Sequence, residues 1–265
     1  MTPIAVTIAG SDSGGGAGIQ ADLKTFSALG VYGASVVTAL TAQNTLGVTG
    51  IHDVPAEFIA AQIDAVFCDF AVSAVKIGMV SQRPVIEAIA AGLDRWKQTQ
   101  VVLDPVMVAT SGDKLLAPDA IDALRSVLFP RALVVTPNLP EAAALLDAPV
   151  AETEADMRAQ AERLLALGPR AVLIKGGHGS GAESVDLLVE PAAFTRLPAA
   201  RIATRNTHGT GCTLSSAVAA GLAKGLSLGE AASTAKTYVT SAIAASERLE
   251  IGSGHGPVHH FHSWW

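Results

Sequence analysis

The residues best suited to chemistry lie in one glycine-rich stretch, residues 206–217. Gly209 and Gly211 bracket Thr210, and Cys212 follows them, ahead of an alanine-rich run that favours a helix. A glycine turn at a helix start points backbone amides and the positive end of the helix dipole at one spot, which favours an anion such as phosphate. The same field should stabilise a thiolate and so lower the pKa of Cys212. A tight turn around a small buried cysteine would explain the same residues. Motifs elsewhere in the chain are needed to separate the two interpretations.

Phosphoryl transfer would combine this turn with acids and a lysine from elsewhere in the chain. The reaction needs an anion cradle, acids that organise a metal, a cation on the phosphates and an acceptor placed in line. Residues 209–212 would supply the cradle. Asp104 and Glu141 would organise Mg²⁺ through water, because Mg²⁺ keeps much of its hydration shell. Lys175 would pair with phosphate oxygens, and Cys212 would orient or deprotonate an acceptor hydroxyl.

The elements that must position these residues alternate between strands and helices. Apolar runs predict strands at residues 4–9, 34–40, 48–54, 74–78, 101–105, 132–137 and 171–178, and a β-ribbon formed by 185–189 and 201–204. Helices are expected at residues 19–26, 55–67, 84–96, 118–128, 138–146, 210–224 and 228–249, with a further helix capped by Thr153. Continuous apolar strands between helices predict an α/β fold with three layers, α/β/α, around a mostly parallel sheet. Because the chain contains no polar linker, we expect one domain over residues 1–265.

Polar residues collect at the predicted strand ends. Ligands of open parallel sheets bind beyond the carboxyl ends of the strands. The residues at those ends are Gly10 with Asp12, Gln43 with Asn44, Lys76 with Gly78 and Met79, Asp104, Thr136 with Asn138 and Glu141, and Lys175 with Gly176 and Gly177. Each alone has a structural explanation, since an asparagine at a helix start is usually a cap. Their shared position predicts a site along one edge of the sheet.

Composition limits the class of protein. Of the 265 residues, 49% are hydrophobic and 16% charged, and the net charge of −6 provides no basic surface for nucleic acid. No apolar run reaches the roughly 18 residues of a membrane span, and the N-terminus does not read as a signal peptide. Two cysteines allow one disulfide at most, so we expect a cytoplasmic protein. Cys68 is expected at a helix packing position.

A second glycine loop, residues 14–18, follows the first predicted strand. The loop lacks the Gly-Lys-Ser/Thr of a P-loop and a clean Gly-x-Gly-x-x-Gly, and no acid closes a second strand to bind a ribose. A phosphate role is therefore disfavoured. We expect a role in binding a small molecule, with Asp22 pointing inward.

Three histidines in the C-terminal tail raise the question of a metal site. His259, His260 and His262 are spaced so that neighbours point to opposite sides, and no acid or cysteine accompanies them. We therefore expect a structural tail, docked by Trp264 and Trp265, rather than a metal centre.

Taken together, these motifs resemble those of the hydroxymethylpyrimidine/phosphomethylpyrimidine kinases of thiamine biosynthesis, members of the ribokinase-like superfamily. The resemblance extends over essentially the whole chain. It is carried by residues 9–25, 42–45, 76–79, 103–107, 136–142, 175–178, 206–213 and 256–262. It implies ATP-dependent phosphorylation of 4-amino-5-hydroxymethyl-2-methylpyrimidine to its monophosphate and then to the diphosphate. It also implies Mg²⁺ as the metal and a homodimer as the assembly.

The resemblance assigns roles to individual residues. Gln43 is implied to pair with the pyrimidine edge, and the ring is surrounded by Gly10, Asp22, Met79 and Val106. The nucleotide is expected to contact Lys175, Asn138, Thr207 and Lys236. Cys212 occupies the place where sugar kinases of the superfamily carry an aspartate. Because a thiolate accepts hydrogen bonds more weakly than a carboxylate, the helix dipole would have to keep it deprotonated if it acts as a base.

Two other functions stay open at this point. A pyridoxal kinase also takes a flat nitrogen heterocycle with a hydroxymethyl group, and a second phosphorylation of the product would separate the two activities. A catalytically silent binding protein would hold the pyrimidine or nucleotide for regulation. The acids, the lysine and the Gly-Thr-Gly-Cys turn argue against it, and ADP release on adding pyrimidine would exclude it.

Overall fold

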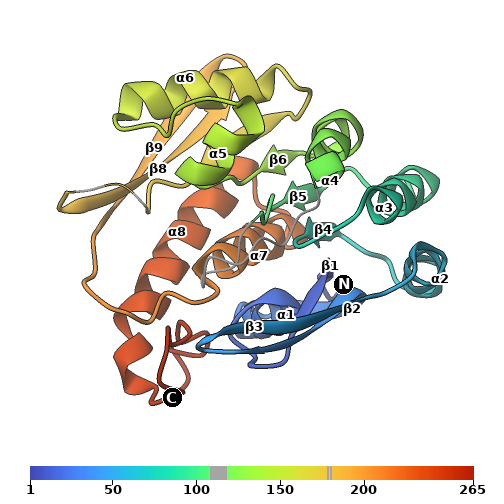
Figure 1. Cartoon of the computed structure of the whole chain (residues 1–265), viewed down its shortest axis with the longest axis horizontal. Coiled ribbons are helices and arrows are strands. Elements are labelled where there is room, and N and C mark those ends of the chain that lie inside the picture. The colour runs from blue at the N-terminus through green and yellow to red at the C-terminus, as the bar shows by residue number, and fades with distance from the viewer. Residues whose placement is uncertain (108–117, 178, 180) are drawn as a thin grey trace.

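One sheet of nine strands organises the described part of the chain, which comprises residues 1–107, 118–177, 179 and 181–265 of a computed structural model. Its strands are β1 (Ile4–Asp12), β2 (Tyr32–Asn44), β3 (Gly47–Asp53), β4 (Ala74–Ile77), β5 (Val101–Leu103), β6 (Val134–Val135), β7 (Ala171–Ile174), β8 (Glu183–Glu190) and β9 (Ala193–Ala200). They lie in the order β3-β2-β1-β4-β5-β6-β7-β8-β9 (Figure 1).

The centre of this sheet is parallel and its margins are antiparallel. Strands β2, β1, β4, β5, β6 and β7 pair in parallel. Strand β3 pairs antiparallel with β2 at one edge, and β8 and β9 form an antiparallel hairpin at the other. From β1 the chain continues to β2 on one side, whereas β4 and the strands after it lie on the other side. The connections therefore diverge between β1 and β4. Such a switch point leaves a crevice at the carboxyl ends of the strands.

Helices cover both faces of the sheet, which confirms the predicted three-layer α/β/α class (Figure 1). The helices are α1 (Gly18–Ala28), α2 (Ala56–Phe67), α3 (Arg83–Arg95), α4 (Pro118–Ala123), α5 (Leu139–Leu146), α6 (Glu154–Leu165), α7 (Thr210–Ala223) and α8 (Leu228–Ala244). Buried side chains of α2 to α6 form one core, and those of α1, α7 and α8 form the other. Within the described residues, no helix combines the length and apolar character needed to cross a bilayer.

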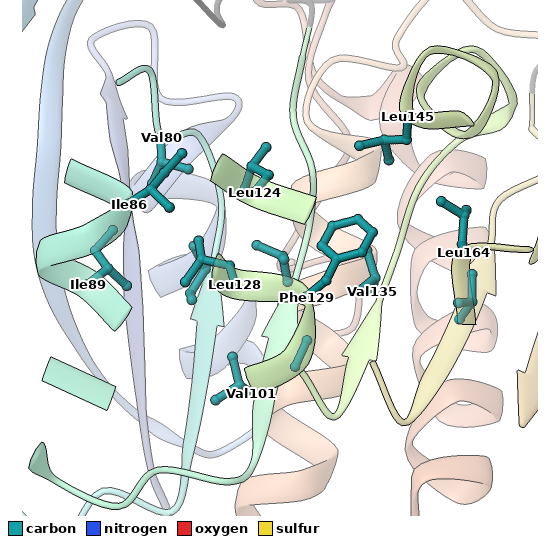
Figure 2. Close-up of a cluster of buried hydrophobic side chains, with 14 of the residues drawn as sticks. Val80, Ile86, Ile89, Val101, Leu124, Leu128, Phe129, Val135, Leu145 and Leu164 are labelled. Atoms are coloured by element: carbon teal, nitrogen blue, oxygen red, sulfur yellow. The ribbon is translucent and has the colours of Figure 1, made fainter. Parts of the chain in front are cut away.

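The larger core joins the first of these helix layers to the sheet (Figure 2). In this view Phe129 lies beside Val135 on β6 and Leu128 lies above Val101 on β5, while Ile86 belongs to α3 and extends the cluster to that helix. All five side chains are at most 1% exposed. Burial of each such side chain contributes about 1.5–3 kcal/mol, so this layer holds the parallel strands in place.

Helix α7 lies in the middle of the other face and carries the predicted chemistry at its first turn. Every residue from 213 to 223 is buried, and all are small or of medium size. Small side chains let this helix lie close against β1, β4 and β5, between α1 and α8. A helix that is buried all round has no solvent face, so its sequence lacks the usual amphipathic pattern.

The predicted β-ribbon is present, but its second strand was misplaced. Strand β9 occupies Ala193–Ala200, whereas the expected strand at residues 201–204 is irregular. Most of β9 is exposed, and Pro198 lies within it, as only an edge strand allows. The strand therefore shows none of the apolar run that predicts a buried strand.

Two predicted helices differ from the structure at their C-terminal ends. Helix α8 ends at Ala244 instead of Leu249, and a short 3₁₀ turn, Ser246–Arg248, follows it. The helix expected to end at Leu128 is α4 followed by a wider π-helical turn, Leu124–Leu128.

Cys68 and the tryptophans of the tail do not pack as expected. Cys68 caps the end of α2 with its side chain exposed, because the preceding Phe67 takes the core position. Trp264 and Trp265 are 71% and 65% exposed. The tail docks instead through the buried segment 256–260, beside the end of α8 and near β3 (Figure 1).

Candidate active site

A cavity of about 910 Å³ lies along the carboxyl ends of the parallel strands. The first turn of α7 forms part of its wall, as do Asp104 after β5 and Lys175 after β7. One end is formed by the last residues of β1 and β2 and by residues after β4, and the other by β8, the end of β9 with the residues after it, and α8. Because these elements lie at opposite margins of the sheet, the cavity is long enough to have two compartments.

The turn at the start of α7 requires glycine. Gly209 has φ 77°, and a Cβ there would overlap the carbonyl oxygen of Gly16. The first helical bond runs from the amide of Thr213 to the carbonyl of Gly209. Among the described residues, the amides of Gly211 and Cys212 have no backbone acceptor, as is usual in a first helical turn. These amides are therefore available to an anion.

The turn faces the predicted acid and lysine. A Cβ on Gly211 would lie 3.2 Å from Lys175 Nζ and 3.6 Å from Asp104 Oδ2. Lys175 Nζ donates to Asp104 Oδ1 at 2.7 Å and lies 3.8 Å from Glu141 Oε2. The hydroxyl of Thr136 donates to the same Asp104 oxygen at 2.9 Å. The structure thus brings together residues from three strand ends and one helix start.

The two acids of this cluster differ in their affinity for a proton. Burial opposes ionisation of Asp104, but the charges of Lys175 and Lys76 outweigh it and hold its pKa below the usual range. Burial raises the pKa of Glu141 to about 7, and the charge of Asp104 adds to this effect while Lys175 opposes it. Lys175 therefore offsets the negative charge of Asp104, while Glu141 remains able to bind a cation or a proton.

Asn138 holds Glu141 in place. Its side chain accepts from the amide of Glu141 at 2.8 Å, and Glu141 Oε2 accepts from the amide of Asn138 at 2.7 Å. This reciprocal pair is a capping box at the start of α5. Asn138 was predicted to contact the nucleotide, and it does line the cavity, but its side chain also has this capping role.

The pKa of Cys212 shifts in the direction opposite to the prediction. Although the residue is partly exposed to the cavity, burial raises the pKa of its thiol to about 11, and the carboxylates of Asp22 and Asp104 add to this. Lys76 and the amide of Gly18 act the other way but do not compensate. The prediction of a thiolate was therefore wrong, because the helix start supplies only partial charges.

Asp22 does not line the cavity, in contrast to the prediction. It is fully buried, and its carboxylate accepts from the hydroxyls of Thr7 and Ser216, both at 2.6 Å. Its third partner is Lys76, whose Nζ lies 2.8 Å away and which does line the cavity. Burial lowers the pKa of Lys76, but the charge of Asp22 more than compensates, so the lysine stays protonated. Asp22 does point inward, as expected, but its carboxylate contacts this lysine and does not line the cavity.

Lys76 was predicted to lie at a strand end beside the site, but the sequence analysis gave it no role there. It lies in the middle of β4, whose other residues are apolar and whose positions are all buried. A charged residue within such a strand is costly unless it is paired, so its presence there was the available signal.

One end of the cavity collects the residues expected around a pyrimidine. Gly10, Gln43, Met79 and Val106 all line it. A Cβ on Gly10 would lie 3.2 Å from the sulfur of Met79, so glycine lets the backbone come close to the methionine. The hydroxyl of Thr41 lies within hydrogen-bond distance of the carbonyl oxygen of Ser11, at 2.8 Å, and of Gln43 Oε1, at 3.0 Å, and donates its one proton to one of them.

The opposite end collects the remaining residues expected at the nucleotide. Thr207 and Lys236 both line the cavity there. Lys236 Nζ pairs with Asp186 Oδ2 at 2.8 Å, and Asp186 Oδ1 accepts from the amide of Gly176 at 2.9 Å. Apolar walls at this end come from Ile202, Val239 and Ile243. Asp186 was not predicted, because it lies inside a strand and not at a strand end.

In the loop at residues 14–18, backbone amides bind a carboxylate of the chain itself. Asp12 accepts from the amides of Gly14, Gly16 and Ala17 at 2.8–3.0 Å. Its Oδ2 also lies 2.8 Å from Nε2 of His208, just ahead of the α7 turn. With these amides already used, the loop has no cradle for a phosphate. It instead supports the turn at Gly209.

The acids of the cavity suit a metal that is shared with a ligand. Within the described ranges, no group of three or more histidines, cysteines and acids is placed to hold a metal ion by itself. Asp104 and Glu141 offer hard oxygen donors beside the α7 turn, and the raised pKa of Glu141 marks uncompensated negative charge there. Mg²⁺ commonly binds through one or two carboxylates plus substrate phosphates and water, so these residues fit it.

Solved structures define the class of this protein. The pyridoxal kinase of Bacillus subtilis in its ADP complex matches with a TM-score of 0.91 at 38% identity, over 98% of this chain and 98% of that chain. The phosphomethylpyrimidine kinase of Clostridium difficile 630 matches with a TM-score of 0.80 at 47% identity, over 91% of this chain and 99% of that chain. The fold is therefore that of the ribokinase-like kinases, as predicted.

Sequence comparison then identifies the family. The model of the phosphomethylpyrimidine kinase family matches residues 12–259. The hydroxymethylpyrimidine/phosphomethylpyrimidine kinase of Rhizobium meliloti is 65% identical over 265 residues, which are 100% of this chain and 99% of the relative. The chain belongs to the phosphomethylpyrimidine kinase family, which confirms the family predicted from the motifs. One predicted marker, His178, lies outside the described residues.

The raised pKa of Glu141 predicts a pH dependence of stability. The folded protein keeps a proton on Glu141 that the unfolded chain releases, so its contribution to stability is lost as the pH rises from about 4.5 through about 7. Replacement by Gln removes this loss. Relative to the wild type, Glu141→Gln should therefore gain on the order of 2 kcal/mol in unfolding free energy between pH 4.5 and pH 8, measured by urea titration. Glu190→Gln, at the exposed end of β8, is the control. Equal pH slopes for wild type and Glu141→Gln would contradict the prediction.

Proposed function

We propose that the protein is an ATP-dependent kinase that phosphorylates 4-amino-5-hydroxymethyl-2-methylpyrimidine to its monophosphate and then to the diphosphate, in thiamine biosynthesis. One observation carries the proposal. The amides of the α7 turn, Lys175 and Asp104 meet in one cavity, between an end lined by Gln43 and Met79 and an end lined by apolar side chains and Lys236. The names of the relatives support the choice of substrate.

The residues of the cavity divide the work of phosphoryl transfer. ATP lies at the end formed by α8 and the β8–β9 hairpin, with its phosphates directed to Lys175. The amides of Gly211 and Cys212 stabilise the charge that develops on the transferred group, since a loose transition state spreads charge over its equatorial oxygens. Gln43 binds the pyrimidine edge, which places the hydroxymethyl group in line with the turn. Positioning and charge stabilisation together account for most of the catalysis in this reaction class.

Asp104 and Glu141 would hold Mg²⁺ through water and through the phosphates of ATP. When bound, the metal neutralises charge on the phosphates. Glu141 would hold the metal as a carboxylate, because a nearby positive charge lowers the pKa of its carboxyl group. Lys175, which pairs with Asp104 in this structure, lies where its ammonium group can contact the transferred group.

Cys212 acts as a hydrogen-bonding group and not as a preformed base. A pKa of about 11 leaves its thiol protonated at neutral pH. The sulfur accepts a hydrogen bond from the hydroxyl of the first substrate and orients its oxygen toward the phosphorus. As the new P–O bond forms and the bond to ADP breaks, the hydroxyl proton passes to an oxygen of the transferred phosphoryl group. In the second step the acceptor is a phosphate oxygen, which carries negative charge already and needs no such help.

We also propose, from the family resemblance, that the chain forms one kinase domain and works as a cytoplasmic homodimer. Sedimentation equilibrium would give the mass of two chains of 27.0 kDa each.

The number of phosphates on the product tests the proposed activity. With ATP, Mg²⁺ and the hydroxymethylpyrimidine, the purified protein should yield a monophosphate and then a diphosphate, resolved by ³¹P NMR, with two ADP formed per pyrimidine. A reaction that ends at the monophosphate, with pyridoxal as the better acceptor, would assign the protein to the vitamin B6 kinases instead. Absence of ADP with either acceptor would indicate a binding protein.

Loss of the Cys212 sulfur should separate the two steps. Cys212→Ala should lower kcat/KM for the hydroxymethylpyrimidine by about 10- to 100-fold, and for the monophosphate by less than about fivefold, because only the first acceptor needs orientation of a hydroxyl. Each substrate is assayed separately by coupled ADP detection. The matched control is Cys68→Ala, which removes an exposed thiol that does not line the cavity. Equal losses in both steps would contradict the assigned role.

A further inference from the structure

The C-terminal tail takes no part in the chemistry proposed above, yet it contacts both sides of the acceptor end of the cavity. We call residues 252–260 the C-terminal strap. The strap contains the whole Gly-Pro-Val-His-His sequence, which is part of the motif at residues 256–262, and its residues 256–260 are all buried. A tail segment that is so enclosed at the end of a chain has to be held by specific partners.

The first side of the strap lies against the turn between β2 and β3. Thr45 accepts from two strap amides: its hydroxyl from Gly254 at 3.2 Å and its carbonyl from His255 at 2.9 Å. A Cβ on Gly252 would overlap the hydroxyl of Thr45, and a Cβ on Gly254 would overlap its carbonyl oxygen. This close contact is made two residues beyond Gln43, whose side chain lines the pyrimidine end.

The second side of the strap lies against the α7 turn. The amide of His208 donates to the carbonyl of Gly256 at 3.0 Å, and the amide of Val258 donates to the carbonyl of His208 at 3.3 Å. The ring of His260 lies 3.0 Å, Nε2 to Oγ1, from the hydroxyl of Thr213, the residue after Cys212. The strap is therefore bonded immediately before and immediately after the residues that cradle the phosphoryl group.

Helix α8 anchors the strap from behind. Tyr238 donates its hydroxyl proton to the carbonyl of His260 at 2.7 Å, and the amide of His259 donates to the carbonyl of Ala242 at 3.0 Å. With this anchor, neither the β2–β3 turn nor the α7 turn can shift without breaking a bond to a common, buried segment.

We propose that the strap is a positioning element that fixes the distance between Gln43 and the α7 turn, and so sets how well each acceptor oxygen meets the transferred phosphoryl group. The inference rests on the proposed function for its substrate. The unphosphorylated pyrimidine has only its ring contacts to hold its oxygen in place, so it depends on this spacing. The monophosphate has a second anchor, because its negatively charged phosphate is also attracted by the lysines that line the cavity, such as Lys76. Loosening the strap therefore weakens use of the first acceptor more than use of the second.

Gly254→Ala tests the proposal, because the new methyl group would push the strap off Thr45. We expect the KM for the hydroxymethylpyrimidine to rise about tenfold, the KM for the monophosphate to rise less, and the KM for ATP to stay within about twofold, since small displacements of a bound group are costly. Gly229→Ala, where a Cβ meets nothing within 4 Å, is the matched control. A fall in kcat that is equal for both acceptors, with all three KM values unchanged, would overturn the proposal, because a merely structural defect lowers the use of both acceptors alike.

A second pair of variants guards against misfolding of the first. Thr45→Val removes the hydroxyl that Gly254 donates to, and Thr45→Ser keeps it. The KM for the hydroxymethylpyrimidine should rise in Thr45→Val and return toward the wild-type value in Thr45→Ser. An equal rise in both variants would overturn the role of this hydrogen bond.

Hydrogen exchange on the free, full-length protein tests the coupling without turnover. Gly254→Ala should speed amide exchange in residues 41–48 and in residues 207–214 together, and leave residues 134–146 unchanged. Faster exchange in only one of the first two segments would show that the strap does not join them and would overturn the proposal. A wild type that fails to phosphorylate the pyrimidine would refute the proposed function, while the exchange result would still decide the role of the strap.

Discussion

The site depends on the requirement that buried charges be paired. Asp104 and Glu141 lie behind the α7 turn with a single lysine between them, and Lys175 contacts Asp104 more closely than Glu141. Leaving a buried carboxylate without a partner costs several kcal/mol, so the cluster holds its geometry only while the lysine is present. The same incomplete compensation is what makes the cavity attractive to a cation. The metal binding proposed for this site thus follows from an imbalance of one charge.

This constraint explains why the surrounding sequence is so rich in small residues. Amides can reach the charge cluster only if α7 lies deep against the central strands, and only small side chains on that helix permit it. The turn ahead of the helix in turn needs Gly209, because the loop at residues 14–18 lies directly against it. The carboxylate of Asp12 accepts hydrogen bonds from the amides of that loop. The loop can therefore lie close to the turn without leaving amides that would bind an anion.

Much of this could be predicted from the sequence, because in a parallel sheet the ends of strands meet at one edge. Gly10, Gln43 and Lys175 are far apart in the chain and all line the cavity, as their positions after predicted strands implied. What could not be predicted depends on which way a buried side chain points. Asp22 pairs with Lys76 across 54 positions of sequence, and no local pattern marks that contact. The thiol of Cys212 likewise titrates according to acids from distant elements, so its helix position alone misled.

The contact between Gly16 and Gly209 joins the first loop of the chain to one near its end, and the strap that follows is later still. Synthesis on the ribosome proceeds from the N-terminus, so the early βα units emerge long before the turn that will face them. A nascent chain that holds only the early units therefore carries Gly10 and Gln43 from one end of the cavity, but neither the α7 turn nor the residues of α8. The two ends of the cavity are thus completed at different times during synthesis, and the full lining exists only after the segment from Thr207 to Ile243 has been made.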